Sequence, residues 1–252
     1  MSKPTLVIFT GDHHVGSDDA IAPASLTRTN VSRRLLDKWS GDFLPHLKRQ
    51  AKNHRLLLAL GGDHIEGHHH NSQRVWGDAK EQRDAAIALL LPLATMADEI
   101  IAVCGTEAHV GSGGEDDRQV AQELGARIIS QRVLLRVGGR LLDWAHHGIA
   151  VSQNGWMADN GIATAIRRAD DAALRNHQPA PDLILSHHAH RSPAPVFMRG
   201  MWGAVCGAWQ ASTPYGSKIA PRSCVDIGVI AWWPEVNRLE RWLYNDETTA
   251  IS

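Results

Sequence analysis

The chain has 252 residues, of which 43% are hydrophobic and 21% charged, with a formal net charge of -1. This composition supports a packed core, and the near-neutral charge gives no overall field that would attract nucleic acid or a membrane surface. Three cysteines form no disulfide framework, and we find no leader peptide or bilayer-length apolar run, so we expect a cytoplasmic protein without a membrane partner.

Four apolar runs predict buried strands. They cover residues 5–10, 55–60, 99–104 and 182–186. Runs that are apolar at nearly every position are typical of strands covered on both faces, as in the parallel sheets of α/β proteins. Ligands of such sheets bind outside the carboxyl ends of the strands. The residues that directly follow these runs are therefore the candidates for chemistry.

The segments between the first three runs have helical patterns. A helix capped by Thr29 or Asn30 is expected to be interrupted by Ser40-Gly41-Asp42 and followed by a second helical stretch to about residue 53. A further helix is expected over 79–96, with Pro92 kinking it or ending its first segment. The first half of the chain therefore predicts a βαβαβ arrangement.

The second half is richer in antiparallel strands. Two hairpins and one helix are expected, over residues 132–137 with 140–146, 226–233 with 238–244, and 160–176. Two sheets packed face to face, with helices outside, would accommodate both halves of the chain. Because the length suits one large α/β unit, we expect a single domain over 1–252.

Histidines gather directly after the predicted strands. The motifs in chain order are Asp12-His13-His14, Gly62-Asp63, Gly105-Thr106-Glu107-Ala108-His109, His146-His147-Gly148 and His187-His188-Ala189-His190. Any one of these motifs is ordinary loop sequence when taken alone. Together they deliver imidazoles and carboxylates from separate strand ends, and these are the ligands that transition metals prefer.

The order of these motifs resembles that of the calcineurin-like metallophosphoesterase superfamily, whose pattern is D-x-H, G-D, G-N-H-[DE], H-G and G-H-x-H. The resemblance spans about residues 5–245 and matches four of the five blocks in their ligand residues. In the last block His187 replaces the family's glycine, and both ligand positions are kept. The resemblance implies a four-layer α/β/β/α sandwich of two mixed sheets flanked by helices.

The resemblance also implies two divalent metal ions. The first would be held by Asp12, His14 and His190, the second by His147 and His188, and both by Asp63. A shared carboxylate offsets the repulsion between two cations, which lie about 3.5–4 Å apart in such sites. The phosphoester would be hydrolysed by a hydroxide bridging the two metals, so Asp63 is also a catalytic residue. We expect manganese, with iron, zinc, nickel or cobalt as alternatives for this donor set.

The third block departs from the family pattern. Thr106 stands where the family has an asparagine ligand, and its hydroxyl is a poorer ligand than the neighbouring Glu107 carboxylate, so both residues are candidate metal ligands. His109 is the candidate general acid, displaced by two residues along the chain. The opposing interpretation is a degenerate second site that binds one metal or none. Of the neighbours His146 and His147, we expect His147 to be the ligand because it directly precedes a glycine, as in the family.

These features predict a metal-dependent phosphoesterase acting on a phosphomonoester or phosphodiester, with a small molecule or a nucleotide as substrate. Arg191, directly after the last ligand, is the candidate phosphate contact. A nuclease is an alternative, although the near-neutral charge supplies no basic track by itself. Another class is a binding module that keeps the fold without hydrolysis. The altered Thr106-Glu107 block favours this class, and the six retained ligands oppose it.

Overall fold

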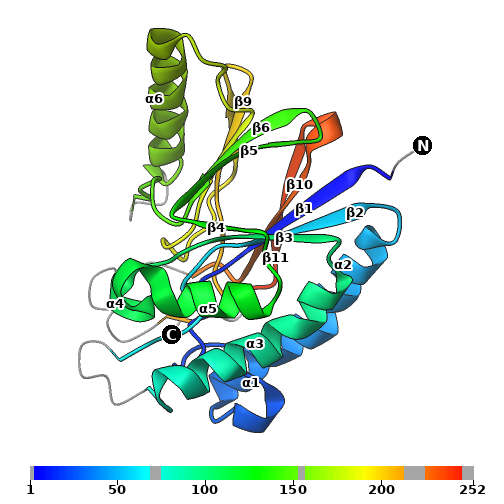
Figure 1. The fold of residues 1–252 in the computed structure, drawn as a ribbon, viewed down its shortest axis with the longest axis vertical. Coiled ribbons are helices and arrows are strands. Elements are labelled where there is room, and N and C mark those ends of the chain that lie inside the picture. The colour runs from blue at the N-terminus through cyan, green and yellow to red at the C-terminus, as the bar shows by residue number, and fades with distance from the viewer. Residues whose placement is uncertain (1–2, 69–74, 153–156, 213–224, 246–252) are drawn as a thin grey trace.

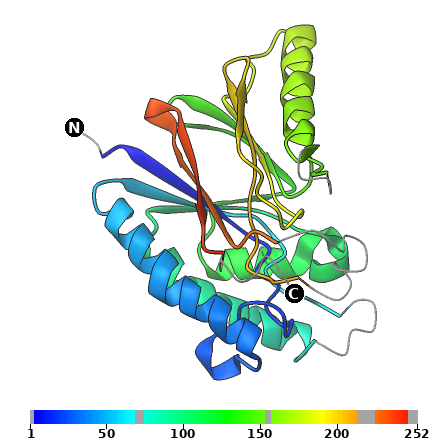
Figure 2. The same cartoon turned by 180° about the vertical axis from the view of Figure 1, so that it is seen from behind.

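Two β-sheets lie face to face, with helices on the outer side of each (Figure 1). The structure is a computed structural model and describes residues 3–68, 75–152, 157–212 and 225–245. The longer helices are α1 (Asn30–Asp37), α2 (Leu44–Ala51), α3 (Ala79–Met96), α5 (Glu115–Glu123) and α6 (Asn160–Asn176). Helix α6 covers one sheet and the other four cover the opposite sheet, as Figure 2 shows from behind. The expected α/β/β/α sandwich is thus confirmed.

The first sheet has the strand order β11-β10-β1-β2-β3-β4. Its strands are β1 (Thr5–Thr10), β2 (Arg55–Leu60), β3 (Glu99–Val103), β4 (Ile128–Ser130), β10 (Gly228–Trp233) and β11 (Arg238–Leu243). β1 to β4 run parallel, whereas β10 pairs antiparallel with both β1 and β11. The carboxyl ends of β1, β2 and β3 therefore meet at one edge of the sheet.

The second sheet has the strand order β5-β6-β7-β9-β8. Its strands are β5 (Arg132–Val137), β6 (Arg140–Ala145), β7 (Leu183–Ser186), β8 (Val196–Met198) and β9 (Met201–Val205). β5 and β6 form the expected hairpin, and its turn residues Gly138 and Gly139 both have positive φ, 54° and 82°. β6, β7 and β9 run parallel, so their carboxyl ends also meet at one edge.

Strand alternation explains why the first sheet is buried on both faces. In β1, Val7 and Phe9 contact the second sheet, while Leu6 and Ile8 contact the helices. The ring of Phe9 meets that of Trp144 on β6 edge to face, with ring centroids 5.6 Å apart. Alternate residues thus fill two separate cores, which is the reason for the continuous apolar runs in the sequence.

One expectation for the helices was wrong. Ser40-Gly41-Asp42 does not interrupt the first helix, because a π-helical segment, Lys38–Phe43, joins α1 to α2. The wider turn places Trp39 and Phe43 in the core, where Trp39 packs edge to face on Trp209 at 4.7 Å between ring centroids. Pro92 lies within α3 and does not end it, so of the two effects expected of this proline the kink stays a prediction. The predicted cap is Thr29, whose side chain accepts a hydrogen bond from the Ser32 amide.

Short segments complete the described fold. They are the 3-10 turns Ala24–Leu26, Ser112–Gly114 and Pro234–Val236 and the one-turn helix α4 (Glu107–Val110), which directly follows the β3 loop. No helix in the described ranges is both long enough and apolar enough to cross a membrane.

Candidate metal centre

The loops after β1 and β2 stay paired beyond the ends of their strands. The Asp12 amide donates to the Gly62 carbonyl oxygen at 2.9 Å, and the His14 amide donates to the Asp63 carbonyl oxygen at 3.0 Å. The loop after β7 joins them, because the His188 amide donates to Oδ2 of Asp12 at 3.0 Å. Hydrogen bonds donated by backbone amides therefore hold three motif loops of both sheets together.

Five of the predicted ligands have a left-handed backbone. Their φ values are 50° for Asp12, 47° for His14, 49° for Asp63, 68° for His188 and 51° for His190. In the described ranges only eight residues other than glycine have positive φ, so the predicted ligands make up most of them. Such a conformation costs about 1–3 kcal/mol per residue and persists where the surrounding structure enforces it, which is typical of functional sites.

The first predicted metal group comes together as expected. Asp12, His14 and His190 each offer a ligand atom, and these atoms lie within 4.8 Å of one another. Nε2 of His14 is 3.1 Å from Nε2 of His190, which in turn is 3.6 Å from Oδ1 of Asp12. These three side chains are therefore able to share one cation.

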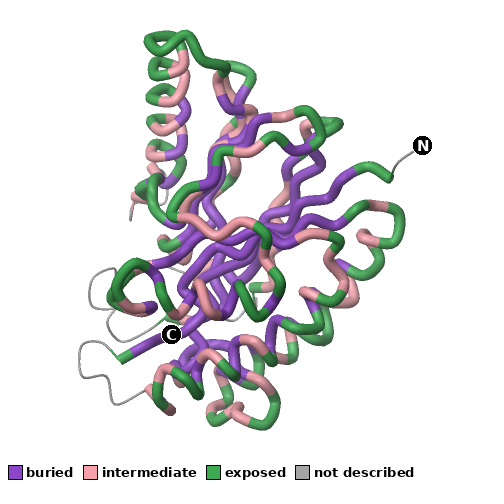
Figure 3. Tube along the Cα trace, in the orientation of Figure 1, coloured by how far each residue is buried: buried purple, intermediate pink, exposed green. Residues whose placement is uncertain are grey.

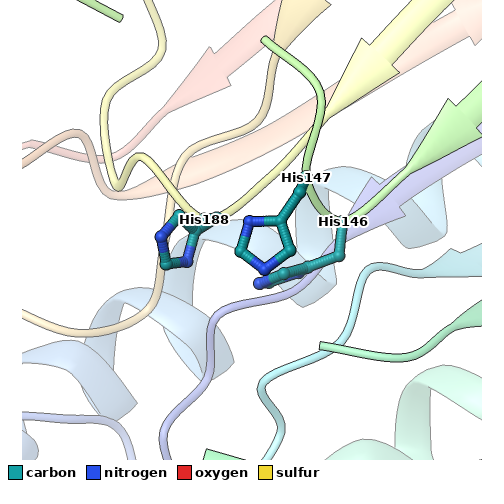
Figure 4. Close-up of side chains that lie close together, drawn as sticks. All are labelled: His146, His147 and His188. Carbon is teal, nitrogen blue, oxygen red and sulfur yellow. The ribbon is translucent and has the colours of Figure 1, made fainter. Parts of the chain in front are cut away.

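The second group contains His146 as well as the predicted His147 and His188. Figure 4 shows the three imidazoles together, with His147 and His188 side by side. Their ring centroids are 4.3 Å apart. His147 is exposed, whereas His146 is buried. The structure thus brings both neighbours to the site and does not choose His147 over His146.

Asp63 lies between the two groups. Its carboxylate is fully buried and falls within ligand distance of Asp12 and His146. Nε2 of His146 is 3.0 Å from Oδ2 of Asp63, and Nδ1 of His188 is 4.0 Å from the same oxygen. This is the position that a bridging carboxylate requires.

Thr106 and Glu107 lie in different environments. The Thr106 hydroxyl is 3.1 Å from Oδ2 of Asp63 and 3.3 Å from both Nε2 of His147 and Nδ1 of His188. Glu107 is exposed, and its Oε1 accepts a hydrogen bond from the Gly113 amide at 3.0 Å. Among the described residues, no candidate ligand group includes Glu107. The Thr106 hydroxyl therefore lies at the second group, whereas the Glu107 carboxylate contacts the Gly113 amide.

His109 lies on the side of the first group. Its ring meets that of His14 edge to face, with centroids 4.6 Å apart, and it forms a ligand group with His14 and Asp63. Nδ1 of His109 donates to the Glu66 carbonyl oxygen at 2.9 Å, because a carbonyl oxygen can only accept. Burial lowers the pKa of His109 to about 4. At neutral pH the ring is therefore neutral.

Two residues outside the sequence motifs, Glu66 and Asp117, support the cluster. Oε2 of Glu66 lies 2.9 Å from Nδ1 of His14 and accepts a hydrogen bond from Gln210 at 3.0 Å. Asp117, buried at the start of α5, accepts from the amides of Asp63, His64 and Gly105 at 2.9, 3.0 and 2.7 Å. In the sequence, only the position of Glu66 three residues after Asp63 could have indicated that it lies near the site.

Gly105 is required by close packing. A Cβ atom at this position would lie 2.1 Å from Oδ1 of Asp63 and 2.3 Å from its backbone nitrogen. The loop after β3 can therefore approach the Asp63 carboxylate only with a glycine here.

The carboxylates of Asp12 and Asp63 are both held in their charged form. Burial alone would raise the pKa of Asp63, but hydrogen bonds from His146 and His188 lower it well below its usual value. Burial would likewise lower the pKa of His14, but its ion pair with Glu66 raises it to about 9. In the described ranges, the ion pairs of Asp12 and Asp63 are all with histidines.

This donor set fits divalent metal ions. Oδ1 of Asp12 is buried and has no hydrogen-bond donor among the described residues. A buried carboxylate oxygen without a donor is costly unless a cation lies beside it. Imidazole nitrogens and carboxylate oxygens suit Mn, Fe, Co, Ni or Zn. Asp12, His14 and His190 would hold one ion, and His146, His147, His188 and Thr106 would hold another, with Asp63 shared.

A pocket of about 350 Å³ opens beside the second group. His147, His188 and Arg191 are among the residues that line it. Nη1 of Arg191 donates to the Ser152 carbonyl oxygen at 2.7 Å, and within the described ranges the side chain has no ion pair with a carboxylate. The predicted phosphate contact thus lies at the pocket with its positive charge available.

No protein-family model and no curated protein sequence matches the chain. Among solved structures it is similar to a novel archaeal phosphodiesterase, at 9% identity over 95% of this chain and 100% of that chain, with a TM-score of 0.47. It is also similar to Vps29 of Chaetomium thermophilum, at 10% identity over 96% of each chain, with a TM-score of 0.48. TT1561 of Thermus thermophilus is similar at 10% identity over 95% of this chain and 99% of that chain, with a TM-score of 0.44.

These likenesses concern the arrangement of sheets and helices. The observed sandwich, with five motif blocks at the carboxyl ends of its strands, is the arrangement that the resemblance to calcineurin-like metallophosphoesterases implies.

Proposed function

We propose that this protein is a metal-dependent phosphoesterase with a dinuclear centre. One observation carries the proposal. Eight aspartate and histidine side chains from both sheets form overlapping ligand groups. Five of them adopt the left-handed backbone that aims them there. This costly arrangement does not stabilise the fold, whereas two-metal hydrolysis of a phosphoester requires ligands that converge in this way.

The residues of the chain have separate roles in this proposal. Bound divalent ions would supply the nucleophilic water and neutralise charge on the phosphate oxygens. The Asp63 carboxylate would offset the repulsion between the two ions and orient both of them. Arg191 would bind a phosphate oxygen from the pocket side, since a guanidinium donates in the bidentate geometry that phosphate accepts. Glu66 would hold the His14 ring with Nε2 toward the metal.

His109 is proposed as the general acid. The ring is neutral in the metal-free chain, and the negative charge of a bound phosphoester would favour its protonated form. His109→Ala should then slow hydrolysis most for esters with poor leaving groups, while metal content holds. Loss of metal in that variant would instead make His109 a ligand.

The proposal also covers the native metal, the substrate class and the location. We propose manganese as the native metal, with iron, zinc, nickel or cobalt as alternatives. The substrate is a small phosphoester or a nucleotide, and a nuclease is the alternative within the same chemistry. The sparse cysteines favour a cytoplasmic location.

Turnover of chromogenic esters tests the proposal. The manganese-loaded protein should hydrolyse bis-p-nitrophenyl phosphate or p-nitrophenyl phosphate, and the ratio of the two rates gives the preference for diester over monoester. Asp63→Asn should lower kcat at least about 100-fold, because a neutral amide no longer offsets two cations. Glu115→Gln, on the exposed start of α5, is the control and should retain full turnover. Full activity of Asp63→Asn would refute the bridging role.

A binding module without hydrolysis is the second candidate function. The observation that favours it is the orientation of Glu107, which contacts Gly113 and leaves the weaker Thr106 hydroxyl near the second group. In this case the chain would bind one metal or none and turn over neither chromogenic ester with any added divalent ion.

A further inference from the structure

Helix α6 covers only part of the outer face of the second sheet. It packs on β9, where a Cβ atom at Gly203 would lie 2.5 Å from Cγ2 of Ile162. Ile162 and Ile166 are the buried residues of this 17-residue helix. Figure 3 accordingly shows α6 as mostly exposed or intermediate, beside strands that are largely buried. Among the described residues, no further element therefore covers the outer face of β6 and β7 beside the helix.

A groove of about 640 Å³ occupies this space. Its helix side includes Asn160, Thr164, Arg168 and Ala169, and its sheet side includes Asp143 and Ile184. One end reaches His147 and Gly148, which also line the pocket beside the second ligand group. The groove is thus continuous with the candidate metal centre, and its volume lies in the range of small-molecule sites, about 300–1,000 Å³.

Strand alternation makes the floor of the groove polar in places. Leu183 and Leu185 of β7 face the core between the sheets, so Ile184 and Ser186 face outward. The Ser186 hydroxyl is buried and has no hydrogen-bond partner among the described residues. A buried hydroxyl without a partner is costly, and a polar ligand in the groove would satisfy it.

The groove carries unneutralised positive charge. Asp143 is the one carboxylate among the described residues that line it, and Arg132 binds this carboxylate through two hydrogen bonds of 2.6 and 2.5 Å. Arg168 is exposed and forms no ion pair within the described ranges. Charge complementarity therefore favours an anionic ligand over an apolar peptide or a second apolar surface.

Arg168 lies well away from the metal groups along the helix. Gly161, near the start of α6, lies against the loop after β6, since a Cβ atom there would lie 1.7 Å from the Ala150 carbonyl oxygen. Seven residues of helix separate Gly161 from Arg168, a distance of about 10 Å. An anion bound by Arg168 is thus distinct from a phosphate at the metal centre.

We propose that this groove binds the leaving-group side of a phosphodiester substrate, and that Arg168 contacts a second phosphate on it. Small side chains along α6 leave room for a sugar and base between the two phosphates. The occupant is accordingly a short nucleotide chain with a terminal phosphate. The choice of occupant rests on the proposed phosphoesterase function, whereas the binding of a second phosphate does not.

Calorimetry with two dinucleotides tests the groove in the metal-free protein, where turnover does not interfere. The probes are thymidine dinucleotide with a 5′-phosphate and the same dinucleotide without it. Wild-type protein should bind the phosphorylated probe about tenfold more tightly, as expected for one charge-assisted contact. Arg168→Ala should abolish this preference. Arg167→Ala, an exposed neighbour that does not line the groove, is the matched control and should preserve it.

A second variant tests whether the probes bind in the groove itself. Ala169→Phe fills the groove from its partly exposed helix side and should weaken both probes. Equal affinity of wild type and Arg168→Ala for the phosphorylated probe would overturn the proposal, as would the absence of any binding. If the protein shows Arg168-dependent binding but hydrolyses neither chromogenic ester, the proposed groove stands and the proposed phosphoesterase function fails. If the protein hydrolyses the chromogenic esters but its binding of the phosphorylated probe does not depend on Arg168, the phosphoesterase function stands and the groove proposal fails.

Discussion

Thr106 holds the carboxylate of Asp63 with two hydrogen bonds. Its amide donates to Oδ1 at 2.6 Å, and its hydroxyl donates to Oδ2 at 3.1 Å. The same hydroxyl is 3.3 to 3.4 Å from nitrogen atoms of His146, His147 and His188. One residue thus fixes the plane of the proposed bridging carboxylate and lies at the centre of the second ligand group.

The first prediction concerns this hydroxyl. Thr106→Val keeps the shape of the side chain and removes its oxygen, so the second metal should bind at least about tenfold more weakly. Thr106→Ser keeps the oxygen and should behave as wild type. Metal content after dialysis against a weak chelator measures the effect. Equal metal content in the two variants would show that the hydroxyl plays no part in the site.

The second prediction separates His146 from His147. Nδ1 of His146 donates to the Gly61 carbonyl oxygen at 2.6 Å, and this contact directs Nε2 toward Asp63. A ring oriented in this way is the better ligand. His146→Ala should therefore lower metal affinity about 10- to 100-fold and by more than His147→Ala does, as measured by chelator competition. The reverse order would support His147, as expected from the sequence.

The motif order indicated where these ligands would lie, because each apolar run had to end at the same edge of its sheet. It could not rank His146 against His147, since adjacent residues of a loop follow no strand alternation. It also could not place Glu107. The Glu107 carboxylate is the stronger ligand by chemistry, but in this structure it accepts a hydrogen bond from the Gly113 amide.

The third prediction concerns protons released on metal binding. The ion pair with Glu66 raises the pKa of His14 against the effect of burial, and the hydrogen bond with Asp63 does the same for His146, each to about 9. At pH 7.5 both rings are thus protonated in the metal-free chain, and each must lose its proton to bind a metal. Calorimetry in buffers of different ionisation enthalpy should show release of about two protons. Heats that do not depend on the buffer would contradict these pKa values.

The same shifts predict how the metal-free fold responds to alkali. Because both pKa values are raised from 6.5 to about 9, their contribution to stability is fully present below pH 6.5 and disappears as the pH rises through about 9. Thermal unfolding of the metal-free protein should therefore begin at lower temperature at pH 10 than at pH 7. Addition of metal should reduce this difference, since metal-bound imidazoles carry no such proton.

The fourth prediction concerns Asp117. Its carboxylate accepts three buried amide hydrogen bonds, and an asparagine amide group would face one of those donors with another donor. Asp117→Asn should lower the free energy of unfolding by about 3 kcal/mol, as measured by urea denaturation. Glu115→Gln on the same helix, where the side chain is exposed, should change it by less than about 0.5 kcal/mol. A difference below about 1 kcal/mol for Asp117→Asn would refute the role of this carboxylate.

Asp117 and the π-helical segment illustrate what local sequence does not contain. Asp117 is one of three consecutive acidic residues, Glu115 to Asp117, and only the packing of α5 against the β3 loop decides which of them faces buried amides. Ser40-Gly41-Asp42 is turn-forming by composition, but burial of Trp39 and Phe43 on either side keeps the chain helical. Tertiary packing overrides local preference in both places.

Metal content per chain is the most direct test of the central claim. Elemental analysis of protein reconstituted with manganese and freed of excess metal should give close to two ions per chain, and Asp63→Asn should retain few or none. One ion or none in the wild-type protein, together with no turnover of either chromogenic ester, would contradict the dinuclear phosphoesterase and favour the binding module.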